Sequence, residues 1–284
     1  MYRKIMGFLE AWKESKHRKP LILQGARQVG KTYSILEFGR THYENVAYFN
    51  FETNPKLNET FEENISPDYL IPILSHIAGQ TIVKEKTLMV FDEVQLCERA
   101  LTSLKYFCEN APDYHIIVAG SLLGVAVNRA KFSFPVGKVD MKTLYPMDME
   151  EFMLALGEDD LVKQIKKCFQ TDTPLPSALH DAAMQLYRQY LVVGGMPECV
   201  MQFAGTKDYI LVRHTQDTIL ASYLNDMSKY NTLNEIKKTR LAYDNITVQL
   251  SKKNTRFQYK LIKKGGRASE FENAIEWLCL SGIV

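Results

Sequence analysis

The fold of this chain is decided by one stretch of sequence, Gly25-Ala26-Arg27-Gln28-Val29-Gly30-Lys31-Thr32, which matches the pattern G-x-x-x-x-G-K-[ST] at every required position. It follows the apolar run Leu21-Ile22-Leu23 and leads into a segment with helical periodicity. Between a strand and a helix, the two glycines let the backbone wrap around phosphate groups, and the helix N-terminus adds partial positive charge. The stretch therefore predicts a P-loop that binds a nucleoside triphosphate.

The side chains of the loop have separate expected roles. We expect the Lys31 ammonium to bridge the β- and γ-phosphates of ATP, and the Thr32 hydroxyl to ligate Mg²⁺. The rest of the loop and the following Tyr33 are expected to contact the nucleotide. Three cations remain candidates for neutralising the γ-phosphate in the transition state: Arg27, Arg129 and Lys138.

A second motif follows further along the chain. Four apolar residues, 88–91, end in the carboxylates Asp92 and Glu93. A buried strand would deliver Asp92 to the sheet edge beside the P-loop, where it can hold Mg²⁺ or its water shell. Glu93 would then orient or deprotonate the attacking water. An isolated Asp-Glu pair is more often a helix start or a surface turn, but its combination with a complete P-loop favours the catalytic interpretation.

A third apolar run, 115–119, ends in Gly120-Ser121. If this run is a strand between the two motif strands, the Ser121 hydroxyl lies near the γ-phosphate or the attacking water. We therefore list Ser121 as a catalytic candidate, with capping of the next turn as the alternative.

The pattern of apolar runs and helical segments predicts an α/β fold, a parallel P-loop NTPase sheet with helices on both faces. We expect strands at residues 20–24, 46–51, 87–91, 115–119 and about 138–144. Helices are expected at 30–38, 68–79 and 101–110. The core domain would span residues 1–148. A helical lid would follow at 149–228, with helices at 151–156, 160–169, 177–191 and 210–223.

Residues 229–284 show a different sequence pattern, with short basic helical segments. Helical patterns at 236–250 and 257–264 precede Gly265-Gly266, and a last helix places Ala268, Phe271, Ile275 and Leu278 on one face. Three short helices followed by an incipient strand predict a winged helix-turn-helix that is truncated before its wing. This segment is rich in lysine and arginine, so DNA is an expected partner, with interdomain packing as the alternative.

Composition narrows the class of protein. Hydrophobic residues make up 46% of the 284 residues and charged residues 24%, which is typical of a globular protein. Charges scattered through the first 20 residues exclude a signal peptide, and no apolar run is long enough to span a membrane. Five separated cysteines without C-x-x-C spacing indicate free thiols, so we expect a cytoplasmic protein.

Five segments together carry a resemblance to a known family: Gly25–Thr32, 91–95, 119–124, 144–152 and 190–198. On these five segments the chain resembles AAA-type P-loop ATPases of the additional-strand catalytic-glutamate class. More narrowly, it is similar to a bacterial and archaeal ATPase family related to the signal-transduction ATPases with numerous domains. In that family the Gly-Gly-x-Pro-Glu segment lies in the lid and contacts the nucleotide pocket. The resemblance thus implies that Gly195 and Pro197 sense the adenine or ribose.

The sequence departs from the family pattern in two respects. Where many members have Gly-Arg before the fifth strand, this chain has Gly137-Lys138, which weakens the assignment of an arginine finger there. Members usually continue into a nuclease-like C-terminal domain of unknown function, which this sequence lacks; that missing domain, or a protein partner, is expected to complete the function.

Three functions remain open at this level. The first is a Mg²⁺-dependent ATPase that works as a nucleotide-driven switch or acts on a macromolecule. The second is a DNA-binding regulator that uses ATP only as a ligand, and the third is a small-molecule kinase. Glu93 beside Asp92 suits activation of water and argues against the kinase.

Overall fold

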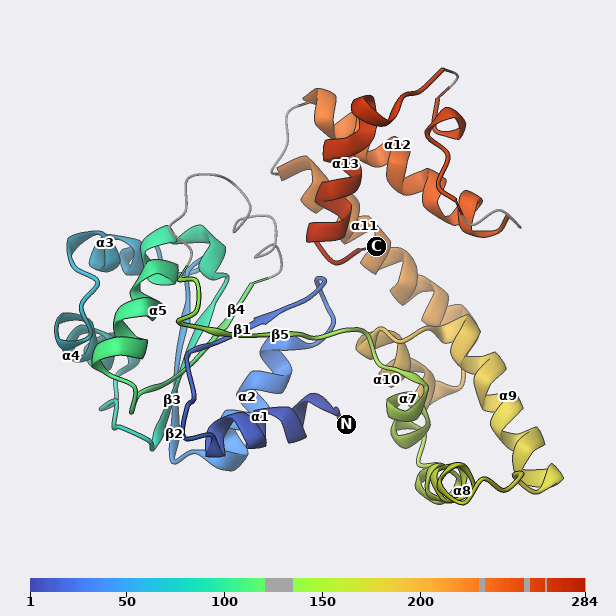
Figure 1. The fold of residues 1–284 in the computed structure, drawn as a ribbon, viewed down its shortest axis with the longest axis horizontal. Helices are drawn as coiled ribbons and strands as arrows, with labels where there is room; N and C mark the ends of the chain where they lie inside the picture. The colour runs from blue at the N-terminus through green and yellow to red at the C-terminus, as the bar shows by residue number, and fades with distance from the viewer. Residues whose placement is uncertain (121–134, 230–232, 253–255, 264, 284) are drawn as a thin grey trace.

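The computed structural model describes residues 1–120, 135–229, 233–252, 256–263 and 265–283 (Figure 1). Its first part alternates helices and strands in this order: α1 (Ile5–Glu14), β1 (Leu21–Gln24), α2 (Lys31–His42), β2 (Asn45–Asn50), α3 (Lys56–Glu63), α4 (Pro67–Ala78), β3 (Thr87–Asp92), α5 (Glu98–Asn110), β4 (His115–Ala119) and β5 (Asp140–Thr143), with a 3-10 turn at Val94–Leu96. The second part is helical: α7 (Met149–Ala155), α8 (Asp159–Gln170), α9 (Ser177–Val193), α10 (Pro197–Thr206), α11 (Tyr209–Lys229), α12 (Leu233–Leu250) and α13 (Ala268–Leu280), with a 3-10 turn at Tyr259–Leu261.

The five strands form one parallel sheet in the order β2-β3-β4-β1-β5. Strand β1, which leads into the P-loop, lies between β4 and β5, with Leu21 paired to Ile117 on one side and Asp140 on the other. Strand β4 therefore separates β1 from β3, the strand that carries Asp92. The expected arrangement of the two motif strands with an additional strand between them is confirmed.

Each face of the sheet packs against its own set of helices. Ile22 of β1 and Phe91 of β3 contribute to a core with α3, α4 and α5. Leu21 and Leu23 of β1 point the other way, into a core with α1 and α2. This alternation is the two-residue period of a strand buried on both faces, and it confirms the predicted α/β class.

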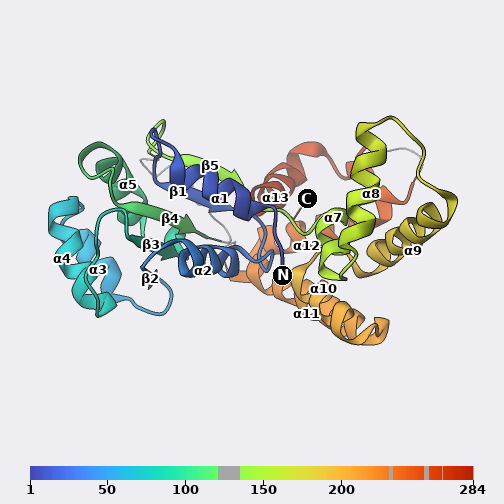
Figure 2. The same cartoon turned by 90° about the horizontal axis from the view of Figure 1, so that it is seen from below.

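Beyond β5 the chain is helical, and the helices α7–α11, for which we keep the name lid, lie to one side of the sheet (Figure 2). Helices α7, α9, α10 and α11 share an apolar core that includes Phe152, Val193, Phe203 and Ile219. Helix α7 begins with a capping box: the Asp148 side chain accepts from the Glu151 amide, and the Glu151 side chain accepts in return.

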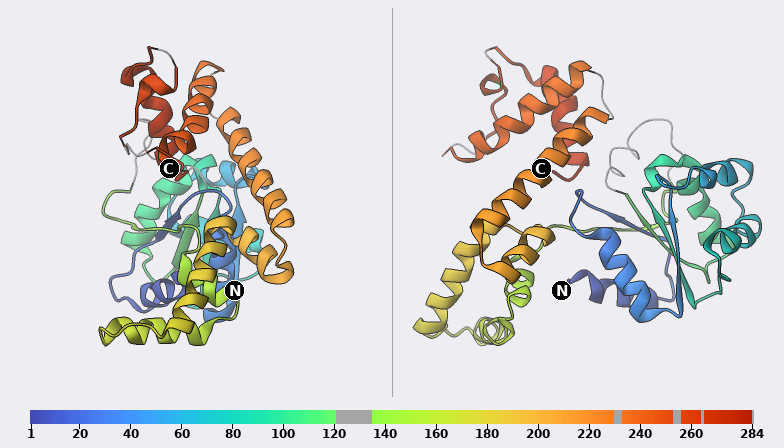
Figure 3. Two further views of the ribbon diagram at one scale, coloured as in Figure 1. Left: turned by 90° about the vertical axis from the view of Figure 1, so that its right-hand side faces the viewer. Right: turned by 180° about the vertical axis from the view of Figure 1, so that it is seen from behind.

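Helix α11 joins the lid to the C-terminal segment (Figure 3). Its last turns supply Met227 to a core that also holds Ala242 of α12 and Phe271 and Trp277 of α13. The helix expected at 257–264 is wrong, because only the 3-10 turn Tyr259–Leu261 is present in the described part of that range. In the described parts of 229–284 there is no strand, and no helix among all described residues is long and apolar enough to cross a membrane.

Candidate functional site

The P-loop follows β1 in a tightly constrained path. A side-chain carbon at Gly25 would lie 2.2 Å from the carbonyl oxygen of Leu144, so only glycine fits there. Gly30 has φ +89°, a left-handed conformation that favours glycine, and it directly precedes the first residue of α2. The two motif glycines are therefore required by the backbone itself.

Lys31 lies in the first turn of α2 with only 7% of its surface exposed. Its ammonium donates hydrogen bonds to the carbonyl oxygens of Gly25 (2.9 Å) and Ala26 (2.8 Å). Burial lowers the pKa of Lys31 to about 8, although the nearby carboxylates of Glu93 and Asp92 oppose this shift. A buried cation held by neutral carbonyls is well suited to bind phosphate oxygens, which would supply the missing negative charge.

Thr32 and Asp92 meet at the carboxyl edge of the sheet. The Thr32 hydroxyl donates to Oδ2 of Asp92 at 2.9 Å, and the Tyr48 hydroxyl donates to the same oxygen at 2.7 Å. Burial, reinforced by the bond to Asp92, raises the pKa of Tyr48 to about 12, so Tyr48 stays a donor. Strand β3 ends beside the P-loop, as predicted. It runs to Asp92, one residue further than the expected range 87–91.

Glu93 directly follows the strand in a left-handed conformation, with φ +52°. Its amide donates to Oδ1 of Asp92 at 3.0 Å, and its carboxylate accepts a short hydrogen bond from the Gln95 side-chain amide. A non-glycine residue in this region of φ and ψ is uncommon and is found disproportionately at functional sites. The turn directs Glu93 into the same cavity as Lys31 and Thr32.

These residues line a cavity of about 710 Å³, a size within the usual range for small-molecule sites. The P-loop side of the wall consists of Arg27, Gln28, Gly30, Lys31, Thr32, Tyr33 and Ser34, with Asp92 and Glu93 at the sheet edge. The opposite wall is helix α10 of the lid, with Pro197, Glu198, Met201, Gln202, Gly205 and Thr206, and the N-terminal Met1 and Arg3 complete the lining. The cavity thus lies between the sheet and the lid.

The two lid residues expected at the nucleotide occupy different places. Pro197 begins α10, lines the cavity and packs near Gly30. Gly195 is not among the lining residues; its carbonyl accepts a 2.6 Å hydrogen bond from the Met147 amide, and a side-chain carbon there would lie 2.1 Å from the Met147 oxygen. Gly195 therefore secures the lid to the segment after β5.

Helix α11 and the C-terminal segment both lie against the P-loop. The Arg27 guanidinium pairs with Asp226 of α11 at 2.6 Å, and the Tyr223 hydroxyl donates to the Arg27 carbonyl at 2.9 Å. A side-chain carbon at Gly282, just after α13, would lie 3.1 Å from the Ala26 amide nitrogen. Arg27 therefore belongs to the cavity and to this contact at once.

Other predicted residues do not join this cluster. Ser121 and Arg129 lie outside the described residues. Lys138 forms an ion pair with Glu109 of α5 at 2.9 Å and is not among the residues that line the cavity, so this arrangement gives no support to a role at the γ-phosphate. Of the two cations considered for that role that the structure describes, Arg27 lines the cavity and Lys138 does not.

Sequence reasoning missed two contributors to the cavity. Helix α10 was not among the expected helices, although the family resemblance had placed Pro197, its first residue, at the nucleotide pocket. Arg3 was also missed, although Ile5, Leu9 and Trp12 follow it at helical spacing and indicate α1, the helix that it precedes and whose buried face they form.

Comparisons with known proteins agree with this architecture. Residues 17–153 match a family model described as an AAA domain, and residues 184–284 match one described as a domain of unknown function, DUF8612. The sheet order and the AAA match together define an AAA-type P-loop ATPase fold, which implies ATP binding, followed by a helical C-terminal region. No curated protein matches the sequence.

Solved structures are similar at low identity. The Aeropyrum pernix ORC2 protein, solved as ADPNP-ADP complexes, aligns at TM-score 0.49 and 12% identity, over 100% of this chain and 87% of that one. The Thermotoga maritima RuvB Holliday junction branch migration motor aligns at TM-score 0.40 and 13% identity, over 98% and 86% of the two chains. C. elegans PCH-2 aligns at TM-score 0.34 and 12% identity, with 61% of this chain covering 48% of that one.

Proposed function

We propose that this chain is a Mg²⁺-dependent ATP hydrolase that works as a nucleotide-driven switch on a macromolecular partner. The observation that carries the hydrolase assignment is the contact between Thr32 and Asp92, with Glu93 beside it and all three facing one cavity with Lys31. This combination supports the proposal, because a hydroxyl and a carboxylate that could hold Mg²⁺, a second carboxylate that could act as base and a cation suited to phosphate line the same cavity.

The residues present fit both ATP and Mg²⁺. Thr32 and Asp92 offer a hydroxyl and a carboxylate 2.9 Å apart, and oxygen ligands of this kind suit Mg²⁺, which keeps several of its waters. When bound, the metal would neutralise charge on the phosphates. Lys31 and the loop amides would hold the phosphates, while Pro197 and Met201 supply apolar surface suited to the base or ribose.

Glu93 is the residue proposed to activate water. Its backbone is fixed by Asp92, and its carboxylate is held by Gln95, so the group is oriented before substrate arrives. A carboxylate in this place would take the proton as the water oxygen bonds to the γ-phosphorus and the bond from that phosphorus to the β–γ bridging oxygen breaks. ADP and inorganic phosphate would then leave, and release of the proton to solvent would complete the cycle.

The switch assignment rests on Arg27. Its guanidinium lines the phosphate side of the cavity and pairs with Asp226, whose side chain is only 7% exposed. Phosphates entering the cavity would compete with Asp226 for this cation, because both are anions within reach of one group. ATP binding would then weaken the contact between the P-loop and α11. The last turns of α11 pack in one apolar core with α12 and α13, so a movement of α11 would reach those helices.

A phosphate-release assay without any added acceptor tests the function. We expect release from ATP in the presence of Mg²⁺, and loss of nucleotide binding in Lys31→Ala by calorimetry. Consumption of ATP only after addition of a small acceptor would instead favour the kinase. Tight ATP binding with no release under any condition would favour the DNA-binding regulator that uses ATP as a ligand.

A further inference from the structure

Arg3 places a buried guanidinium between the P-loop and the lid. Only 3% of the residue is exposed, and its three nitrogens each donate to a different segment of the chain. Nε donates to Oε1 of Glu151 in α7 at 3.2 Å, one terminal nitrogen to the Val29 carbonyl at 2.9 Å, and the other to the Tyr145 carbonyl at 2.7 Å.

The bond to Val29 has a direct consequence for phosphate binding. In a planar trans peptide the carbonyl and the following amide point in opposite directions. The direction of the Val29 carbonyl therefore fixes the direction of the Gly30 N–H, one of the loop amides available to a phosphate. Val29 is fully buried, so its carbonyl needs a protein partner, and Gly30 provides little steric resistance to a rotated peptide.

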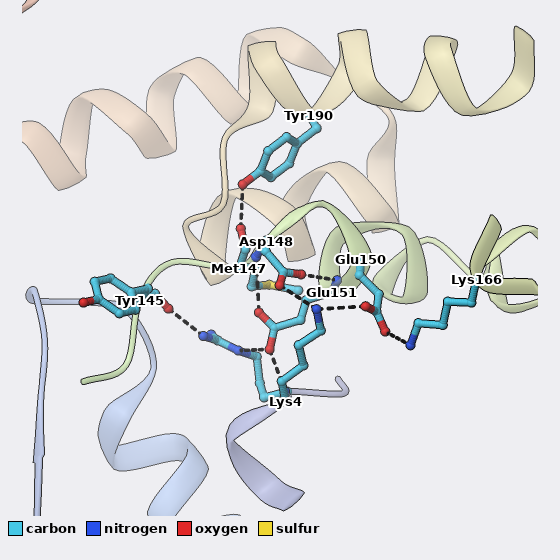
Figure 4. Close-up of polar contacts among 9 residues, drawn as sticks. Lys4, Tyr145, Met147, Asp148, Glu150, Glu151, Lys166 and Tyr190 are labelled. Atoms are coloured by element: carbon cyan, nitrogen blue, oxygen red, sulfur yellow. Dashed lines mark hydrogen bonds and ion pairs between the residues drawn. The ribbon is translucent and has the colours of Figure 1, made fainter. Parts of the chain in front are cut away.

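The lid side of the contact is equally well fixed. Glu151 belongs to the capping box of α7, and its Oε1 also accepts from the Lys4 amide at 2.6 Å. Lys4 in turn pairs with Asp148 and Glu150 at 2.6 and 2.8 Å (Figure 4). Figure 4 also shows Tyr145 and Met147 in the strand-to-helix connection, with Met147 held by Tyr190 of α9.

We propose that Arg3 is a positioning residue: it orients the Val29–Gly30 peptide for phosphate binding and fixes this peptide relative to the start of the lid. The proposal rests on the proposed nucleotide-binding function. A planar guanidinium reaches three acceptors in three directions, and a lysine ammonium at the end of one flexible stem does not reproduce this fork. The guanidinium forms an ion pair with the buried carboxylate of Glu151, so removal of Arg3 also leaves that carboxylate without this cation and with backbone amide donors as its remaining partners.

The experiment measures Mg²⁺-ATP affinity by calorimetry for the parent, Arg3→Lys, Arg3→Ala and Lys4→Gln. We expect Arg3→Lys to bind at least about tenfold more weakly, the equivalent of one charge-assisted hydrogen bond. Lys4→Gln is the matched control, because Lys4 is the neighbouring cation and its ion pairs are partly exposed, with 43% of its side chain accessible. Its ATP affinity should stay within about twofold of the parent.

Chemical rescue separates positioning from general loss of structure. Ethylguanidinium added to Arg3→Ala should restore most of the ATP affinity, whereas ethylammonium at the same concentration should not. Parental affinity in Arg3→Lys, or equal effects of the two additives on Arg3→Ala, would overturn the proposal. If Arg3→Ala does not fold, the affinity of Arg3→Lys decides alone. Failure of the parent itself to bind Mg²⁺-ATP would refute the proposed function instead.

Discussion

The lowered pKa of Lys31 makes a quantitative prediction about nucleotide binding. Burial brings this pKa to about 8 in the nucleotide-free protein, so about half of the ammonium groups are neutral at pH 8. Phosphate oxygens favour the charged form and would return the pKa towards its ordinary value of 10.5. Binding should therefore take up about 0.5 proton at pH 8 and about 0.9 proton at pH 9.

Calorimetry in two buffers of different ionisation enthalpy measures this uptake at each pH. Lys31→Arg is the matched control, because a guanidinium stays charged throughout the range and should show no uptake from this position. Tight ATP binding by the parent with no net proton uptake at pH 9 would refute the reasoning, since the cation would then be charged before the nucleotide arrives.

The lowered pKa of Lys31 also makes the free energy of unfolding depend on pH. The folded pKa lies below the unfolded one, so between pH 8 and 10.5 the unfolded chain binds more protons and stability rises with pH. Relative to Lys31→Met, the free energy of unfolding of the nucleotide-free parent should increase by roughly 3 kcal/mol across this window. Chemical denaturation at several pH values provides the measurement, and a flat difference would contradict the prediction.

Three further predictions concern catalysis, the switch and the C-terminal segment. Glu93→Gln should keep Mg²⁺-ATP affinity but lose turnover, because the amide preserves shape and removes the base; parental hydrolysis would move this role to Asp92. Asp226→Asn should bind ATP about threefold to tenfold more tightly, because a competing anion is removed, and this gain should vanish when combined with Arg27→Ala. Duplex DNA affinity should be modest, independent of sequence and steeply reduced by salt, and it should be abolished by reversing the exposed charges of Lys252, Arg256, Lys260 and Lys263. Binding that is insensitive to salt or selective for sequence would contradict this.

Strands β1, β3 and β4 were predictable because they are short apolar runs placed between clear turn signals, whereas β5 reads Asp-Met-Lys-Thr and is partly exposed. Strand β4 has the predicted bounds, and the other four differ from prediction by one or two residues at their ends. Burial on both faces produces continuous apolar runs, which make a strand visible without any tertiary information. The motifs at Lys31 and Asp92 could be placed beside each other for the same reason, since parallel strands share one carboxyl edge.

The rest of the cavity was not predictable from local patterns. Helix α10 begins at Pro197, a residue that tolerates the first turn of a helix but follows two glycines, so local signals conflicted. The 3-10 turn at Tyr259–Leu261 had helical periodicity over too short a stretch to decide its form. The pair of Arg27 and Asp226 joins residues far apart in the sequence, and no local pattern records such a contact.

The position of β1 inside the sheet also determines when the site can form during synthesis. Strand β1 is made early, but both of its hydrogen-bonding partners, β4 and β5, are made after β2 and β3. A nascent chain that has just emerged from the ribosome thus carries a complete P-loop sequence on a strand with two unpaired edges. Until β4 and β5 have been made, the nucleotide-binding site is not assembled, so nucleotide cannot bind and stabilise the fold. During this time the free edges of β1 need protection from pairing with strands of other chains.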